Sequence, residues 1–158
     1  MKIRRFETIQ DLPVTIDEAW SFLSDPRNLK AITPPYMGFD IQSDPLPEEM
    51  YAGMIVSYRV RPVARIPIIW VTEITHLRKP HYFVDEQRFG PYTFWHHQHH
   101  LRSIEGGVEM KDIVHFKVPG AFLGDLAVPW VVLPKLREIF SYRREKLIER
   151  FGDFPEFR

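Results

Sequence analysis

Cysteine is missing from this 158-residue sequence. Without it the chain can form no disulfide, no thiolate-ligated zinc site, no iron–sulfur cluster and no cysteine nucleophile. A chain without cysteine also suits a reducing compartment, and we expect the protein to be cytoplasmic.

An excess of charge of either sign is also missing, since 21 basic residues balance 21 acidic ones. Sequence-independent binding of nucleic acid needs a basic surface, so we expect neither DNA nor RNA as a partner. Long hydrophobic runs are absent too. The most apolar run, residues 127–133, is too short to span a membrane and is interrupted by Pro129. Basic side chains near the start are followed by no apolar core, so we expect neither a secretory signal nor a membrane span.

Familiar catalytic signatures are a further absence. The sequence contains no nucleophile elbow, phosphate-binding loop, dinucleotide fingerprint or His-Glu-x-x-His motif. No cofactor is therefore expected. The length suits one domain over residues 1–158, large enough to bury about two-thirds of the surface of the unfolded chain.

The most informative stretch spans residues 83–101, where β-forming and aromatic residues flank Gly90-Pro91. A Gly-Pro pair in such a stretch predicts a turn between two strands. Successive side chains of a strand point to opposite faces, and this alternation sorts the hairpin into two sets. The inward face is predicted to carry Asp85, Gln87, Trp95, His97 and His99, and the outward face Tyr92, Phe94, His96, Gln98 and His100. A polar group inside a hydrophobic envelope is the main functional signal.

The remaining elements complete an α+β pattern. Thr15 and Glu18 form a capping box, which predicts a short helix, and Asp25-Pro26 predicts the start of a second one that ends before Pro34-Pro35. Further strands are predicted over residues 2–12, 37–42, 53–61, 66–78 and 108–118, and a long helix over residues 134–151. This order predicts a curved antiparallel sheet of about seven strands wrapped around the terminal helix.

The terminal helix carries an apolar stripe at helical spacing, made of Val132, Leu136, Ile139, Phe140, Leu147 and Phe151. Arg143 falls within this stripe, whereas Arg144 lies towards the opposite margin, where its guanidinium can reach water. An arginine in such a stripe either extends its head to solvent or pairs with an acid. The acids expected inside are Asp85 and Asp112, the second on the apolar face of strand 108–118.

Several motifs carry a resemblance that covers nearly the whole chain. They are Asp25-Pro26-x-Asn28-Leu29, Ile32-Thr33-Pro34-Pro35, Asp85-x-Gln87-x-x-Gly90-Pro91-Tyr92, Trp95-x-His97-x-His99, Met110-x-Asp112 and Ile139-Phe140-x-Tyr142-Arg143. Together with the element order, they resemble the SRPBCC or START-like superfamily, which includes Bet v 1-like and polyketide-cyclase-like proteins, and a bacterial subgroup sometimes labelled cell-division inhibitor. The resemblance implies a helix-grip fold whose deep cavity holds a small hydrophobic or amphipathic ligand. It implies no particular reaction.

Two histidines carry the strongest chemical signal. The imidazoles of His97 and His99 can converge, and Asp85 or Asp112 on neighbouring strands could complete a histidine–carboxylate metal set. The same groups could instead hydrogen-bond one another at a polar end of the cavity, because buried polar groups need partners. We interpret them as such a network, without a metal. If the protein is an enzyme, His97, His99 and Asp112 are the candidate catalytic residues, acting by general acid–base chemistry.

We therefore predict that the protein binds or carries a small hydrophobic or amphipathic molecule and needs no obligate protein partner. The residues predicted to contact it are Trp70, Asp85, Gln87, Trp95, His97, His99, Asp112, Phe140 and Arg143. For the two tryptophans, plain core packing is the alternative role. The alternative functions are a cyclase- or hydratase-like enzyme and a protein-interaction module built on the apolar segment 122–133. Segment 120–134 is predicted to border the cavity mouth and to be more mobile than the strands.

Overall fold

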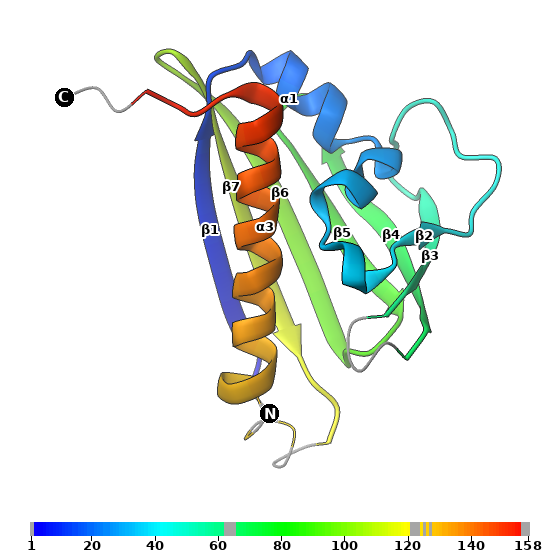
Figure 1. Ribbon diagram of the computed structural model, residues 1–158. Coiled ribbons are helices and arrows are strands. Elements are labelled where there is room, and N and C mark those ends of the chain that lie inside the picture. The colour runs from blue at the N-terminus through cyan, green and yellow to red at the C-terminus, as the bar shows by residue number, and fades with distance from the viewer. Residues whose placement is uncertain (1, 62–65, 121–123, 125, 127, 156–158) are drawn as a thin grey trace.

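A computed structural model describes residues 2–61, 66–120, 124, 126 and 128–155 of the chain (Figure 1). Seven strands of this described part form one antiparallel sheet in the order β1-β7-β6-β5-β4-β3-β2. They are β1 (Arg4–Leu12), β2 (Asp40–Ile41), β3 (Ile55–Val60), β4 (Ile68–Arg78), β5 (Tyr82–Phe89), β6 (Phe94–Ile104) and β7 (Gly107–Lys117). The predicted hairpin at residues 83–101 is β5 and β6. The predicted link between β3 and β4 at residues 62–65 lies outside the described residues.

Short helices follow β1, as predicted. They are α1 (Ile16–Leu23) and the 3-10 helices η1 (Pro26–Ile32) and η2 (Pro35–Met37). The capping box holds the start of α1: the Thr15 hydroxyl accepts from the Glu18 N–H at 3.2 Å, and the Glu18 carboxylate accepts from the Thr15 N–H at 3.0 Å. Asp25 caps η1 by accepting from the Arg27 N–H at 2.9 Å.

Most predicted strands differ from the observed ones by one to three residues at an end, and two elements differ in a way that the local backbone explains. Residues 37–42 were expected to form a strand, but only Asp40–Ile41 pair in β2. Met37 instead ends η2, and Gly38 follows it in the left-handed conformation with φ +52°, which breaks the extended path. The terminal helix α3 spans Leu133–Phe151, and a π-helical turn, η3 (Val128–Val132), precedes it. Pro134 falls in the first turn of α3, a position that proline commonly occupies.

The sheet curves around α3, which lies across β1, β7 and β6 (Figure 1). Helix α1 packs against β6 and β7, and η1 and η2 lie over the remaining strands. Two register shifts between β4 and β5 mark bulges, which bend and twist a sheet locally. Leu147 of α3 packs in one buried cluster with Leu12, and Leu136 packs in another with Phe116. The α+β helix-grip architecture predicted from the sequence is confirmed.

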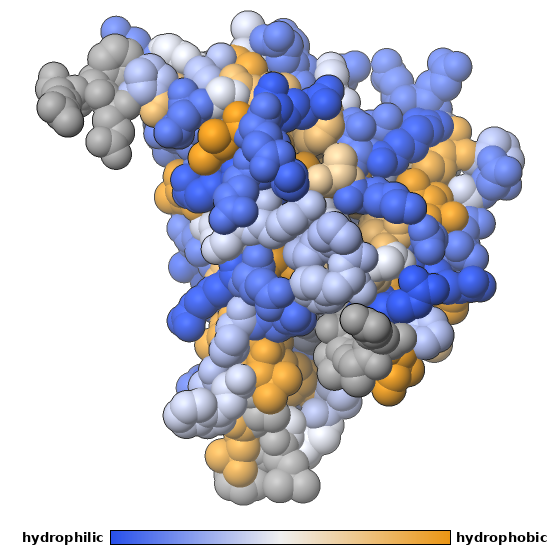
Figure 2. All heavy atoms as spheres, viewed as in Figure 1, coloured by the Kyte–Doolittle hydropathy of each residue, from blue (hydrophilic) through white to orange (hydrophobic). Residues whose placement is uncertain are grey.

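The outer face of α3 is hydrophilic over most of its length, and hydrophobic side chains gather around its N-terminal end (Figure 2). Near that end Trp130 is 83% exposed, and Leu126 and Val131 are also exposed. These three residues belong to the predicted apolar segment 122–133, of which residues 122, 123, 125 and 127 lie outside the described part of the chain. Among the helices described, none is long and apolar enough to cross a membrane.

Candidate ligand-binding site

A cavity of about 720 Å³ lies between the sheet, η1, η2 and α3. Apolar and aromatic side chains from all of these elements form most of its wall. Seven of the nine residues predicted to contact a ligand line it: Trp70, Asp85, Trp95, His97, His99, Phe140 and Arg143. Gln87 and Asp112 do not line the cavity. The side chain of Gln87 hydrogen-bonds to the backbone of Tyr92, and the side chain of Asp112 is fully buried.

Three aromatic rings form one wall of this cavity. The ring centroids of Trp70 and Trp95 lie 5.2 Å apart at an interplanar angle of 88°, and Tyr92 lies 4.8 Å from Trp95 and 5.7 Å from Trp70. The two pairs that include Trp70 are edge-to-face, which is a favoured aromatic geometry. The three rings pack against one another and also face the cavity. The two tryptophans can therefore belong to the core and contact a ligand as well.

Tyr92 corrects the predicted orientation of this stretch. The sequence pattern placed Tyr92 on the outward face, but its ring lines the cavity. The ring centroids of Tyr92 and Phe116 lie 5.9 Å apart. Strand β6 begins only at Phe94, so strand alternation does not govern the residue in the loop before it. Burial raises the pKa of Tyr92 to about 12.

Gln87 explains how that loop is held. Its side-chain amide donates to the Tyr92 carbonyl at 2.7 Å and accepts from the Tyr92 N–H at 3.2 Å. Gly90 leaves room for this clamp, since a Cβ there would lie 2.5 Å from the Gln87 amide oxygen. Gln87 therefore positions Tyr92 and does not reach the polar group formed by the other predicted residues.

Strand register brings the polar group together. Asp85 of β5 lies directly opposite His97 of β6, and His99 of β6 lies directly opposite Asp112 of β7. The two histidines are two residues apart, so both point to the same face of the sheet. Three adjacent strands thus place two imidazoles between two carboxylates. We call these four residues together with Arg143 of α3 the polar cluster.

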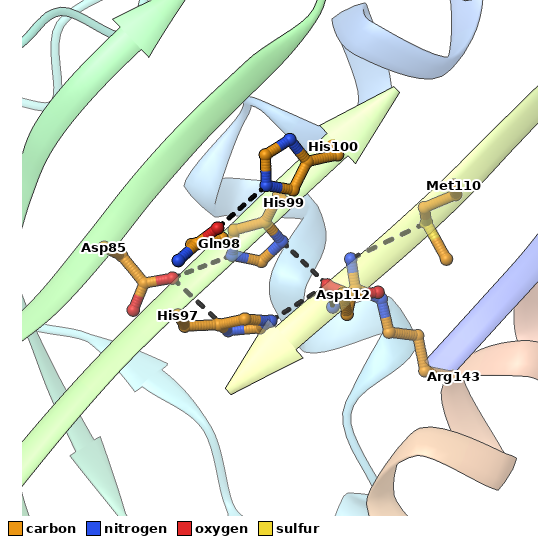
Figure 3. Close-up of polar contacts among 8 residues, drawn as sticks. All are labelled: Asp85, His97, Gln98, His99, His100, Met110, Asp112 and Arg143. Carbon is orange, nitrogen blue, oxygen red and sulfur yellow. Dashed lines mark hydrogen bonds and ion pairs between the residues drawn. The ribbon is translucent and has the colours of Figure 1, made fainter. Parts of the chain in front are cut away.

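Each imidazole contacts both carboxylates (Figure 3). His97 Nε2 lies 2.9 Å from Asp112 Oδ1, and His97 Nδ1 lies 3.4 Å from Asp85 Oδ2. His99 Nε2 lies 2.7 Å from the same oxygen of Asp85, and His99 Nδ1 lies 3.0 Å from Asp112 Oδ1, out of line for a hydrogen bond. The side chain of Asp85 keeps 16% of its surface exposed, whereas Asp112 is fully buried behind the rings.

Neighbouring rings fix the orientation of the two imidazoles. Phe83 stacks on His99 with centroids 4.1 Å apart and an interplanar angle of 15°. His97 meets the edges of Trp95 at 6.1 Å and Phe140 at 5.8 Å, and the imidazole centroids lie 3.7 Å apart. The rings are therefore held from both sides before any ligand enters.

Arg143 adds a positive charge from the helix side of the cavity. Its Nη1 lies 3.4 Å from Asp112 Oδ1, its Nη2 contacts the sulfur of Met110 at 4.0 Å, and the residue is only 7% exposed. Of the two alternatives left open for this arginine, pairing with an acid is the one observed. Arg144 differs, because it is exposed and its guanidinium donates to the Ile9 carbonyl.

The charges of the polar cluster influence one another strongly. Burial opposes ionisation of Asp112, yet the Arg143 guanidinium and the two imidazoles hold its pKa well below its usual range. Burial also opposes ionisation of Asp85, but His97 and His99 lower its pKa. Burial and the nearby charge of His99 lower the pKa of His97. For His99, the adjacent carboxylates of Asp112 and Asp85 outweigh burial and raise its pKa. Both acids are therefore ionised at neutral pH, and the two histidines have different proton affinities.

The same residues include a set of potential metal donors. One donor atom each from Asp85, His97 and His99 lies within 4.8 Å of the others. By contrast, His96 and His100 belong to the opposite face, as predicted, where His100 Nε2 contacts the Gln98 side chain at 2.9 Å.

Some cavity residues escaped the sequence prediction. Tyr58 of β3 lines the cavity, and burial with the nearby Asp85 charge raises its pKa. Tyr36 of η2 and Lys135 of α3 also line the cavity, and the Lys135 ammonium lies 4.1 Å from the ring centroid of Tyr36. Alternation along strand 53–61 could have placed Tyr58 inward. No local signal relates Tyr36 to Lys135, which are far apart in the sequence.

Comparison with solved structures identifies the class of fold. Protein Ms6760 from Mycobacterium smegmatis superposes with a TM-score of 0.65 at 14% identity, covering 95% of this chain and 98% of that one. Ara h 8.0201 gives 0.63 at 14% identity, covering 94% and 99%. The di-domain ARO/CYC BexL from the BE-7585A biosynthetic pathway gives 0.70 at 14% identity, covering 97% of this chain and 51% of that one. No protein-family model and no curated protein matches the sequence. The chain has the Bet v 1-like, SRPBCC-type fold that its motifs predicted.

Proposed function

We propose that this protein binds and carries a small hydrophobic or amphipathic molecule in the cavity between the sheet and α3. The observation that carries the proposal is the cavity itself, about 720 Å³ of space with a mostly apolar wall and one polar cluster. Ligand sites commonly have volumes of about 300 to 1,000 Å³ and combine apolar walls with a few placed polar groups. A ligand with one polar head would orient that head towards Asp85, His97 and His99.

Other features of the chain support proposals about its domain organisation, its partner and its compartment. We propose that residues 1–158 act as one domain, because the first strand β1 pairs with β7 and the terminal helix α3 packs on the same sheet. The balanced charge supports a small molecule rather than nucleic acid as the partner. The lack of cysteine supports the cytoplasm as its compartment.

Extraction of the purified, tag-free protein tests the proposal most directly. Native mass spectrometry should show a species heavier than the bare chain, and solvent extraction should release an apolar or amphipathic compound. A thermal-shift screen of lipids, flavonoids and polyketides should raise the melting temperature, because a ligand that binds only the folded state stabilises it. If nothing copurifies and no compound in the screen shifts the melting temperature, the carrier proposal is wrong.

An acid–base enzyme is the second candidate, and the geometry of His97 favours it. This imidazole lines the cavity, and its Nε2 lies 2.9 Å from the fully buried Asp112, a partner that fixes the ring and its tautomer. On this alternative, a bound substrate would exchange a proton with His97 or His99. Turnover of a screened ligand by the wild-type protein, abolished in His97→Gln, would establish the enzyme; binding without turnover would favour the carrier.

A further inference from the structure

We propose that Asp85, His97 and His99 bind one divalent transition-metal ion, such as Zn²⁺, whose remaining coordination positions open into the cavity. One donor atom from each of these residues lies within 4.8 Å of the others, and the donors proposed are Asp85 Oδ2, His97 Nδ1 and His99 Nε2. The site is independent of the carrier proposal, because it follows from the side chains and requires no organic ligand.

The tautomers of the two histidines supply the first argument. A carboxylate oxygen can only accept a hydrogen, so His97 Nε2, which lies 2.9 Å from Asp112 Oδ1, carries a proton. In a neutral imidazole the other nitrogen then keeps a lone pair, and His97 Nδ1 faces Asp85 Oδ2 at 3.4 Å. His99 Nε2 lies 2.7 Å from the same Asp85 oxygen and donates a hydrogen to it when no ion is bound, whereas His99 Nδ1 is out of line for a hydrogen bond to Asp112.

Asp85 Oδ2, His97 Nδ1 and His99 Nε2 thus converge on one point, where a metal ion can displace the proton of His99 Nε2. A single proton on His99 satisfies the shorter contact with Asp85 but leaves His97 Nδ1 facing a carboxylate without a hydrogen. Two protons, one on each ring, would satisfy both contacts. A divalent ion supplies the same charge and can be bound by all three donors at once.

Formal charge supports the same conclusion. With both imidazoles neutral, the polar cluster contains two carboxylates and one guanidinium, an uncompensated negative charge in a site where Asp112 and Arg143 are 0% and 7% exposed. Buried charges are stable only when they are paired or coordinate metals. Arg143 lies 3.4 Å from Asp112 and so neutralises that acid, which leaves Asp85 as the acid available to a metal.

Asp112 has the position of an outer-shell residue. Metal-binding histidines almost always donate their other ring N–H to a carboxylate, a carbonyl or water, which fixes the tautomer and makes the ring a better ligand. Here one fully buried carboxylate lies against the second nitrogen of both histidines. Phe83 stacks on His99 and the edge of Trp95 meets His97, so the rings are held in the required orientation.

Geometry also allows the ion to enter. Donors bonded to Zn²⁺ at about 2.0 to 2.2 Å in a tetrahedral site are roughly 3.3 Å apart. The Asp85–His97 distance of 3.4 Å already matches this value, while the Asp85–His99 distance of 2.7 Å requires the carboxylate to move outward slightly. Asp85 is the most exposed of the three ligands and can make this movement. All three line the cavity, so water or the polar head of a cavity ligand can complete the coordination, as in open metal sites.

Titration of the tag-free, chelator-treated protein with Zn²⁺ in a calorimeter tests the proposal. We expect one ion per chain. Asp112→Asn should weaken binding about 10- to 100-fold, as is typical for an outer-shell partner, and Asp85→Asn and His99→Gln should weaken it further. The matched control is the double variant His96→Gln/His100→Gln, which removes two histidines from the outward face of the same strand and should bind as the wild type does. Circular dichroism checks that each variant is folded.

Wild-type protein alone provides a second readout, in case a variant does not fold. Long-range ¹H–¹⁵N spectra of the histidine rings identify the nitrogen that binds zinc. The expected ligands are Nδ1 of His97 and Nε2 of His99, with the other nitrogen of each ring remaining protonated. Lack of binding by the folded wild type, loss of binding in the control variant, or zinc shifts confined to other histidines would each overturn the proposal.

Discussion

His97 Nε2 lies 2.9 Å from Asp112 Oδ1, although these two residues are diagonal neighbours rather than direct partners across β6 and β7. The residue directly opposite Asp112 is His99, and its contact is longer, at 3.0 Å, and out of line for a hydrogen bond. The same inversion holds on the other side, where Asp85 lies opposite His97 but closer to His99. Each carboxylate therefore ties both histidines together, and the four side chains form one unit rather than two separate pairs.

Arg143 should be far more important for stability than its neighbour Arg144. Arg143→Ala leaves Asp112 buried without its cationic partner and should lower the free energy of unfolding by about 3 to 5 kcal/mol. Arg144→Ala removes one exposed hydrogen bond to the Ile9 carbonyl and should cost about 1 kcal/mol or less. Urea denaturation of both variants measures the difference. Equal losses would show that the Arg143–Asp112 pair adds nothing to the fold.

Gln87 should support the cavity wall without belonging to the polar cluster. Gln87→Ala removes two hydrogen bonds to the backbone of Tyr92 and should destabilise the protein by about 1 to 3 kcal/mol. With the loop released, the pKa of Tyr92 should fall from about 12 towards the ordinary value of about 10. Gln98→Ala, on the outward face of β6, is the control and should leave that pKa unchanged. An unaltered Tyr92 titration in Gln87→Ala would show that the clamp is dispensable.

Alkaline pH should weaken the fold through the buried tyrosines. A tyrosine ionises near pH 10 in an unfolded chain, whereas burial raises the pKa of Tyr92 to about 12. Because the folded-state pKa is raised, this contribution to stability is complete below about pH 10 and is lost as the pH rises to about 12. Burial raises the pKa of Tyr58 as well, so the effect of this residue has the same sign.

The ultraviolet absorbance of ionised tyrosine measures this directly. The titration curve of the wild type minus that of Tyr92→Phe should have its midpoint near pH 12, while the protein is still folded by circular dichroism. A midpoint near pH 10 would mean that the Tyr92 hydroxyl is solvated and that the cavity is open on that side.

Filling the cavity should block ligand binding while leaving the fold intact. Ile139 of α3 lines the cavity, so Ile139→Trp places a larger ring in the space that a ligand would occupy. We expect the affinity for a fluorescent apolar probe, or for a copurified ligand, to fall about tenfold or more. Glu145→Trp adds the same ring to the exposed face of the same helix and should bind as the wild type does. If both variants bind equally well, the ligand site is not in this cavity.

Local periodicity was sufficient to predict most of the fold. The sequence pattern around Thr15 and Glu18 predicted the start of α1, and the apolar stripe of the terminal segment predicted which face of α3 is buried. Alternation along β6 placed His97 and His99 on one face. These features depend only on residues a few positions apart, because the helix period and the strand period are local properties of the backbone.

Tertiary structure decided the contacts of the candidate site. The register between strands determined that Asp85 and Asp112 contact the histidines from opposite sides, and the loop before β6 turned Tyr92 inward and engaged Gln87 in a backbone clamp. Packing of α3 against the sheet brought Arg143 to Asp112. No single segment encodes these contacts, because each joins residues from different elements whose relative position is set by the packing of the whole sheet and helix.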